Sequence, residues 1–316
     1  MSKKVKGKCL LLGGGGFIGS HLAEKLLKSG YSVRIFDIRN FSHKNIASFL
    51  DNLEIVEGDF HNSKDVRIAL TDIDYVFHLV SFTIPSSSMI NPLFDIETNL
   101  VSSVRFLEEC ILNKNIKSIN FISSGGTIYG IPQIIPIPET HPSSPLNSYG
   151  IIKHTIENYC ILYRKMYGLN CRIFRLSNPY GENQNPHGLQ GVIPVFINKA
   201  ISGEEIEIWG NGSVIRDYIY INDVTDVLTS SLEILSKEFI FNIGTGEGHS
   251  INDIVKIIRN IMKTDVHIRY QPSRNYDVPI NILDISRAKL TFSWKPKMGI
   301  EEGIERMIKH LKLTQI

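Results

Sequence analysis

The chain has 316 residues, and its 34 Lys and Arg residues nearly balance 32 Asp and Glu residues, for a formal net charge of +2. A nearly neutral chain has no broad basic field to hold a nucleic-acid backbone or an anionic membrane surface, so we expect neither partner. The length fits one large α/β domain or a domain with a smaller attachment, and two unequal lobes are the expected arrangement.

The four cysteines, Cys9, Cys110, Cys160 and Cys171, are far apart, with no CxxC spacing and no paired His ligands. This spacing indicates neither a zinc site nor a disulfide framework, and reduced thiols fit a cytoplasmic protein without a bound metal. The N-terminal MSKKVKGK precedes an apolar run of only four residues, which indicates a basic tail before a strand rather than a signal peptide. No apolar segment approaches the ~20 residues of a membrane span.

Short apolar runs alternate with helix-period segments through the first half of the chain. This alternation is typical of βαβ units, whose parallel sheet is buried on both faces. It predicts an α/β fold built on a doubly wound parallel (Rossmann) sheet. The expected strands are KCLLL, YSVRIFD, LEIVEGD, YVFHLV, SINFIS and CRIFRL, and the expected helices span about 17–29, 63–70, 92–113 and 145–168.

The regular alternation weakens after Leu176, in a stretch rich in Pro, Gly and Asn. We expect a first domain over residues 1–175 and a smaller mixed α/β lobe over 176–316, with some later strands returning to the first sheet. The elements expected in the lobe are a helix near 191–202, the strands EIEIW, RDYIYI and FIFNIG, a helix with Ser250 as N-cap, and a terminal helix from about 299.

A glycine-rich turn follows the first strand directly and leads into the first helix. Glycines permit a tight turn and a close approach of the backbone to a pyrophosphate, while the helix N-terminus offers free N–H groups and a positive dipole. This context predicts a dinucleotide site. The residues expected at the turn are Gly13, Gly16, Phe17, Ile18 and Gly19.

The second strand, SVRIFD, ends in Asp37. A carboxylate there accepts hydrogen bonds from the adenosine ribose hydroxyls and repels a 2′-phosphate, so NAD is favoured over NADP. The nearby Arg39 opposes this preference. Asp59 and Phe60 end the third strand as GDF. The carboxylate there either accepts a hydrogen bond from the adenine amino group or belongs to an ordinary turn.

Tyr149 and Lys153 are four residues apart in YGIIK, so on a helix they share one face. A nearby ammonium favours the phenolate, and a tyrosine tuned in this way takes a proton from a sugar hydroxyl near neutral pH. A YxxxK spacing alone is common on helices. Here it follows the fifth strand of a sheet that already has a dinucleotide motif.

With these motifs the chain resembles the extended short-chain dehydrogenase/reductase family, and within it the UDP-glucose/UDP-galactose 4-epimerases. The resemblance runs nearly from end to end. Its motifs are GGxGFIGSHL, GDF, HLV, SSGGTIYG, YGIIK, RLSNPYG, GVIPVFI, RDYIYINDV, FNIGTGEGHSI and SWKPKMGIEEGI.

The resemblance implies bound NAD and a UDP-sugar substrate. The further cofactor contacts that it implies are Ile38, Leu79, Val80, Asn99, Ser123 and Leu176, together with Tyr149 and Lys153. Arg216 and Arg274 would clamp the diphosphate, because guanidinium forks match phosphate geometry. The remaining implied substrate contacts are Asn178, Val192, Ile208, Trp209, Tyr218, Asp277 and Asn281.

The chain departs from the family pattern in the SSGGTIYG turn. Gly125 stands where the family has a Ser or Thr that bonds the reacting hydroxyl, so Ser124, Thr127 or a water would replace it. Related dehydratases and decarboxylases place acidic residues at the positions of Gly126 and Thr127, which disfavours elimination.

The resemblance therefore implies a 4-epimerase that acts through a 4-keto sugar, in nucleotide-sugar metabolism that supplies cell-surface polysaccharides. Two alternatives stay open: an epimerase or reductase for another sugar nucleotide, such as a UDP-uronic acid, and a non-catalytic NAD-binding relative. Asn281 is smaller than the Tyr that confines the pocket in plain-hexose enzymes, so N-acetylated sugars are expected substrates. A homodimer is expected through helices 92–113 and 145–168, whose apolar residues include Val101, Val104, Leu107, Ile156 and Ile161.

Overall fold

The structure is a computed structural model that describes residues 5–188, 190–273 and 278–314. The chain forms two compact units, each assembled from three segments. Unit 1 comprises Met1–Ile128, Pro145–Arg175 and Thr225–Phe241, and unit 2 comprises Tyr129–Ser144, Leu176–Val224 and Asn242–Ile316. Among the described residues, no helix is both long and apolar enough to cross a membrane.

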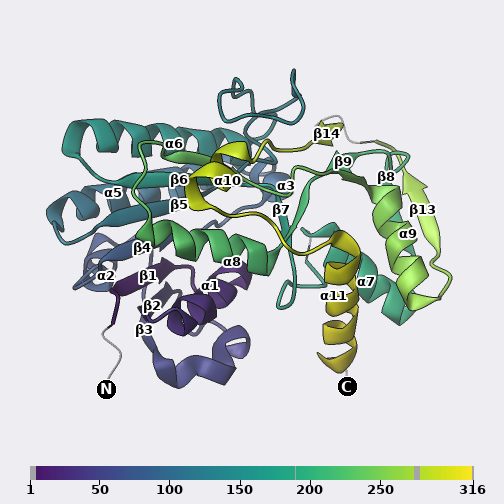
Figure 1. The fold of residues 1–316 in the computed structure, drawn as a ribbon, viewed down its shortest axis with the longest axis horizontal. Helices are drawn as coiled ribbons and strands as arrows, with labels where there is room; N and C mark the ends of the chain where they lie inside the picture. The colour runs from purple at the N-terminus through teal and green to yellow at the C-terminus, as the bar shows by residue number, and fades with distance from the viewer. Residues whose placement is uncertain (1–4, 189, 274–277, 315–316) are drawn as a thin grey trace. The chain divides into compact units, whose positions relative to one another are not determined.

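Unit 1 is built around a seven-stranded sheet in the order β11-β6-β5-β4-β1-β2-β3. Its strands from β6 to β3 are labelled in Figure 1. The pairs from β3 to β5 are all parallel. This confirms the Rossmann sheet. Its strands are β1 (Lys8–Leu12), β2 (Ser32–Asp37), β3 (Leu53–Glu57), β4 (Tyr75–His78), β5 (Ser118–Ser124), β6 (Cys171–Leu176) and β11 (Ile240–Ile243).

The helices predicted in the first half are present. They are α1 (Phe17–Lys28), α2 (Ser63–Ala69), α5 (Ser102–Leu112) and α6 (Ser148–Tyr167). The stretch expected as one helix over 92–113 consists of α4 (Pro92–Asp95), a π-helical segment η2 (Ile96–Val101) and α5. The short α3 (Pro85–Ser88), the 3₁₀ helices η1 (Lys44–Asn52) and η3 (Ser231–Glu233), and α8 (Ile221–Ser230) were not predicted.

The main core of unit 1 lies between the sheet and the packed helices α2, α5 and α6. Fully buried Leu10, Phe121 and Ile173 come from three strands, and Leu107 and Ile156 meet them from α5 and α6. Two of the residues proposed for a dimer face are therefore core residues, because each helix turns its most apolar side to the sheet. Val101, another of the proposed residues, is exposed at the end of η2, and Leu112, Ile151, Leu162 and Met166 are further exposed apolar side chains of α5 and α6.

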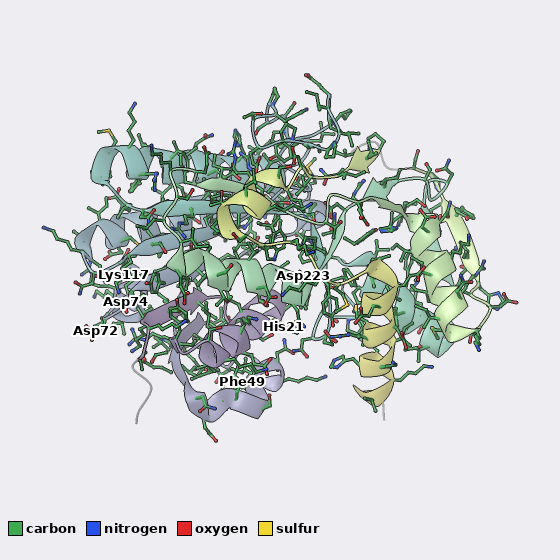
Figure 2. All side chains as sticks on the ribbon, in the orientation of Figure 1. His21, Phe49, Asp72, Asp74, Lys117 and Asp223 are labelled. Carbon is green, nitrogen blue, oxygen red and sulfur yellow. The ribbon has the colours of Figure 1, made fainter. Side chains whose placement is uncertain are left out.

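A charged side chain connects the amino ends of three neighbouring strands, β1, β4 and β5. Asp74 precedes β4; its Oδ2 atom accepts the Lys8 N–H at 2.8 Å, and its Oδ1 atom lies 2.8 Å from Lys117 Nζ (Figure 2). In a parallel sheet the opposite edge, where the strands end, is the one that holds ligands. The contacts of Asp74 therefore lie at the edge of the sheet opposite the candidate site.

Unit 2 is a mixed α/β unit, and its described residues form three small sheets. β8 (Ile206–Trp209) pairs with β13 (Ile268–Gln271), β7 (Asn178–Tyr180) pairs with β10 (Tyr218–Tyr220), and β9 (Ile215–Arg216) lies between β12 (His249–Ser250) and β14 (Ile280–Asn281). Its helices are α7 (Val192–Ser202), α9 (Ile251–Met262), α10 (Ser286–Phe292) and α11 (Ile300–Thr314).

The predictions for this unit are mostly confirmed. Ser250 caps α9, accepting the Asp253 N–H, and the terminal helix begins at Ile300. The single strand expected from RDYIYI is instead divided into β9 and β10. The division occurs at Asp217, whose buried carboxylate accepts the N–H groups of Thr245 and Gly246, so this residue turns inward as a structural anchor.

Candidate active site

The glycine turn after β1 forms the base of a pocket in unit 1. Gly13 has a φ of +78°, which a residue with a side chain adopts only with strain. A Cβ atom on Gly19 would lie 2.6 Å from the Gly14 Cα atom, so only glycine lets α1 approach the turn this closely. Gly16 precedes α1 without a side-chain cap, and no acidic residue lies in the first turn. These features suit an anionic group at the helix N-terminus.

Asp37 lies beside this turn at the end of β2. Its Oδ2 atom accepts the Gly15 N–H at 2.9 Å, and its Oδ1 atom accepts the Ile38 N–H at 2.9 Å. Burial raises the pKa of Asp37 above its ordinary value, although these two hydrogen bonds act in the opposite direction. The carboxylate is therefore held in one orientation at the pocket wall, where a ribose hydroxyl has an acceptor.

The pocket has a volume of about 440 Å³ and lies at the carboxyl ends of the strands of unit 1. Seven predicted cofactor residues line it: Gly13, Gly16, Asp37, Ile38, Phe60, Leu79 and Val80. Eight further residues that were not predicted also line the pocket, namely Gly15, Phe36, Phe41, Ser42, Asn45, Gly58, Ser81 and Phe82. Some of them follow β2 and β4 in loops without periodicity; their position after strand ends was the available signal.

Asp59 and Arg39 are not among the residues that line the pocket. The Asp59 Oδ1 atom accepts the His61 N–H at 2.9 Å and lies 2.7 Å from His61 Nδ1. That backbone hydrogen bond is the main cause of a lowered Asp59 pKa, with a smaller contribution from the charge of exposed Arg39. Gly58 and Phe60 line the pocket on either side of Asp59.

Asn99 supports the pocket wall from η2. Its Oδ1 atom accepts the Phe82 N–H at 2.9 Å, and its Nδ2 atom donates to Asp95 at 2.9 Å. Phe82 belongs to the loop after β4 that lines the pocket. The buried amide of Asn99 therefore fixes the backbone of this loop.

Tyr149 and Lys153 lie on one face of α6, as their spacing predicted. The Lys153 Nζ atom lies 5.6 Å from the centroid of the Tyr149 ring and 5.0 Å from that of Phe121, and it donates a hydrogen bond to the Ile122 carbonyl at 3.1 Å. The Tyr149 backbone N–H donates to Ser88 Oγ at 3.0 Å. The pair is thus held between the start of α6 and the end of β5.

Burial dominates the ionisation of both groups. It raises the pKa of Tyr149 to about 12, with Asp95 adding to the rise and a hydrogen bond from Ser81 opposing it. It lowers the pKa of Lys153 to about 8, against the charges of Asp95 and Glu157. The pKa of the Tyr149 phenol is therefore raised in the chain alone and not lowered as expected from the sequence, because desolvation of the phenolate outweighs the hydrogen bond from Ser81.

The turn between β5 and α6 offers two hydroxyls in place of the missing one at Gly125. Ser124 is half-buried at the end of β5, whereas the Thr127 Oγ1 atom is buried and has no hydrogen-bond partner among the described residues. Ser123, the residue before, is almost completely buried. A Cβ atom on Gly150 would lie 2.8 Å from the Thr127 carbonyl oxygen, so the turn lies directly against the start of α6.

The candidate substrate residues of unit 2 come from paired strands. Asn178 and Tyr218 are register partners in β7 and β10, and Arg216 and Asn281 are register partners in β9 and β14. Arg216 Nη1 donates to the carbonyls of Ile215 and Val278 at 2.9 and 2.6 Å. The buried Tyr218 hydroxyl has no hydrogen-bond partner within the described residues.

Other candidates of this unit differ in accessibility. Trp209 is exposed, while Ile208, Asn281 and Leu176 are buried. Val192 begins α7 and is half-buried. Arg274 and Asp277 lie outside the described residues.

Comparison with known proteins gives one consistent result. Residues 9–244 match the model of the NAD dependent epimerase/dehydratase family. A Methanocaldococcus jannaschii protein named as a putative UDP-glucose 4-epimerase is 36% identical over 304 residues, covering 96% of this chain and 98% of that protein.

Two solved structures extend this similarity. The crystal structure of a UDP-glucose 4-epimerase with UDP-glucose from Thermotoga maritima has a TM-score of 0.92 and 34% identity, over 98% of this chain and 100% of that one. A UDP-N-acetylglucosamine 4-epimerase from Methanobrevibacter ruminantium, in complex with UDP-N-acetylmuramic acid, has a TM-score of 0.91 and 29% identity, over 99% and 100% of the two chains.

Proposed function

The chain belongs to the NAD-dependent epimerase/dehydratase family, and from that premise we propose that it inverts C4 of a UDP-hexose or UDP-N-acetylhexosamine. The observation that carries the proposal is the Tyr149–Lys153 pair, which lies in the same unit as the Asp37 pocket. A proton acceptor and a dinucleotide site in one unit are the two requirements for removing hydrogen from a sugar carbinol.

NAD is the cofactor of this family, and the residues present fit it. The glycine turn and the uncapped start of α1 would hold the pyrophosphate, and Asp37 would accept the ribose hydroxyls. When bound, NAD supplies a hydride acceptor and donor. The loop after β4, held by Asn99, would form the opposite wall.

Tyr149 is the proposed base that takes the proton of the C4 hydroxyl and later returns it. With a pKa of about 12 in the chain alone, its phenol is neutral at pH 7. Ionisation then needs added positive charge nearby, which Lys153 and an oxidised nicotinamide would supply. This requirement couples proton removal to the presence of the oxidised cofactor.

Two further features separate epimerisation from related reactions. Elimination needs a second proton carrier beside the tyrosine, and Gly126 and Thr127 occupy the positions where one would stand. Ser124 is the proposed partner of the reacting hydroxyl, because it is the more accessible of the two remaining hydroxyls. The 4-keto sugar would turn over and receive hydride on its other face, with no net redox change.

Substrate binding is proposed for unit 2. Arg216 is held by two backbone carbonyls, and its guanidinium, together with Arg274, would bind the diphosphate. Trp209 is exposed and offers a flat apolar surface to the uracil. A homodimer through α5 and α6, located in the cytoplasm, completes the proposal.

Nuclear magnetic resonance of the product sugars tests this function. UDP-glucose, UDP-GlcNAc, UDP-glucuronate and their C4 epimers would be incubated separately with the protein. We expect both epimers of the hexose or N-acetylhexosamine pair to interconvert to the same final ratio. Conversion of the uronate pair alone would replace the proposed substrate class. No conversion of any pair, with NAD bound, would favour a non-catalytic NAD-binding protein.

A further inference from the structure

A buried carboxylate without a cationic partner lies behind the start of α6. Asp95, the last residue of α4, has an exposed fraction of 0%. Its Oδ1 atom accepts hydrogen bonds from Thr83 Oγ1 at 2.7 Å and Asn99 Nδ2 at 2.9 Å, and its Oδ2 atom accepts one from Ser148 Oγ at 2.8 Å. Within the described residues it forms no ion pair with Lys or Arg. A buried charge held only by neutral donors is costly, which points to a use for the charge.

The elements around Asp95 place it next to the catalytic pair. α4 and η2 both pack against α6, and α3 does so through Ser88, which accepts the Tyr149 N–H. Ser148, which donates to Asp95, immediately precedes Tyr149 in the first turn of α6. Asp95 therefore acts on both Tyr149 and Lys153 through space, and in each case its charge favours the protonated form.

Lys153 has few charges around it. Glu157 lies one turn further along α6, and the buried His78 faces it from β4. Burial keeps the pKa of His78 at about 3, so that ring is neutral. Glu157 forms an ion pair with Arg175 of β6, with an N–O distance of 2.6 Å. Of these two carboxylates, Asp95 has the larger effect on the Lys153 ammonium and is the one without an ion pair to Lys or Arg among the described residues.

We propose that Asp95 is a positioning residue for the Tyr149–Lys153 pair, and that its buried carboxylate keeps Lys153 in the ammonium form required for proton removal. The catalytic part of this inference rests on the proposed function. The direct action of Asp95 on Tyr149 opposes ionisation of the phenol, so its benefit acts through Lys153. With a pKa of about 8, Lys153 has little margin above neutral pH.

Asp95→Asn removes the charge with almost no change in shape. The amide oxygen can still accept from Thr83 and Asn99, and the amide nitrogen can donate to the Ser148 hydroxyl. Ser148→Ala is the matched control, because it removes one hydrogen bond and keeps the charge. Should Asp95→Asn fail to fold, Asp95→Ser is a smaller neutral substitute.

The test is a direct titration of Lys153 by nuclear magnetic resonance in full-length protein with ¹³C-labelled lysine, the signal being assigned by its loss in Lys153→Arg. We expect a midpoint near 8 in wild type and in Ser148→Ala, and a midpoint lower by about one pH unit or more in Asp95→Asn. Equal midpoints in Asp95→Asn and wild type would overturn the proposal. This titration needs no turnover, so it stands even if no sugar nucleotide is epimerised.

The pH profile of epimerisation gives the second readout. Loss of the Asp95 charge lowers the pKa of both groups, so the active range of Asp95→Asn should move to lower pH. A purely structural role predicts instead a uniform loss at every pH with an unchanged range, and that result would also contradict the proposal. An inactive wild type would refute the proposed function alone.

Discussion

The Asp37 carboxylate is bound to the Gly15 backbone N–H at 2.9 Å, so the end of β2 and the glycine turn form one wall of the cofactor pocket. Only one oxygen of the carboxylate is used in this contact, and the other accepts the N–H of the next residue. The proposed ribose contact and the geometry of the turn therefore involve the same side chain.

Replacing Asp37 by Ala together with Ile38 by Arg should shift the preference from NAD toward NADP. The ribose loses a charged acceptor, which corresponds to a roughly ten- to hundredfold loss of NAD affinity, and exposed position 38 gains a phosphate partner. Fluorescence titration with both cofactors measures the change, with Ile38→Arg alone as control. Equal affinities of the wild type for NAD and NADP would show that Arg39 already offsets Asp37.

Tyr149→Phe should lower kcat by about 10²–10⁴-fold while NAD binding and folding persist. The backbone hydrogen bond to Ser88 does not depend on the phenol hydroxyl. Tyr163→Phe is the matched control, because it removes a phenol hydroxyl from the same helix, where it donates to Glu108. If Tyr149→Phe epimerises nearly as fast as wild type, Tyr149 is not the base.

Much of this site was predictable from sequence order. Asp37 follows from its place after the second strand, and the Tyr149–Lys153 face follows from a spacing of four on a helix. The ionisation state was not predictable, because it depends on how deeply the fold buries these groups. Likewise Leu107 and Ile156 are apolar residues of the kind found in interfaces. That they belong to the core depends on how the helices pack, which the sequence alone does not give.

Contacts distant in sequence account for the rest. Asp95 lies 53 residues from the Ser148 hydroxyl that it binds, and no periodicity connects the two. Phe41 reaches the pocket from the loop after β2 and Asn45 from η1, and the path of both segments is set by tertiary packing. The division of RDYIYI at Asp217 similarly depends on N–H groups near residue 245.

The buried ammonium of Lys153, which is 6% exposed, should make the stability of the chain depend on pH. Burial lowers its pKa from 10.5 to about 8, so between these values the folded chain binds fewer protons than the unfolded chain, and stability rises with pH. Lys153→Met removes this buried charge and should therefore increase the free energy of unfolding. The increase over wild type should be larger at pH 7 than at pH 10, by roughly 2 kcal/mol.

Urea unfolding at the two pH values measures this difference. Lys165→Met, an exposed lysine on the same helix, is the control for the loss of one charge. A Lys153→Met effect that is identical at pH 7 and pH 10 would mean that Lys153 is not destabilised as an ammonium.

The dimer prediction now depends on the side chains that the fold leaves exposed. Leu162 on α6 has an exposed fraction of 45%, and Ile151 and Met166 are exposed on the same helix. An apolar surface of this kind is typical of an interface. We expect a dimer in sedimentation at micromolar concentration and a monomer for Leu162→Glu. Leu290→Glu, at an exposed position of α10, should remain dimeric. A monomeric wild type would contradict the prediction.

The space for the sugar C2 substituent should determine which UDP-sugars the protein accepts. Asn281 is the residue proposed to border it, and its side chain is 1% exposed in β14, beside Arg216 of β9. A Tyr at this place would fill the space that an acetamido group needs. Because the position is buried, it would also strain the packing by about 1–3 kcal/mol.

A loss of overall activity is therefore uninformative, and the ratio between substrates is the quantity to measure. Asn281→Tyr should lower kcat/KM for the N-acetylated pair at least tenfold relative to UDP-glucose and UDP-galactose, which corresponds to about 1.4 kcal/mol. Asn281→Ala keeps the space and removes the amide, so it should lower the same ratio only by the value of one hydrogen bond. Equal losses for both substrate pairs in Asn281→Tyr would remove Asn281 from the specificity of this site.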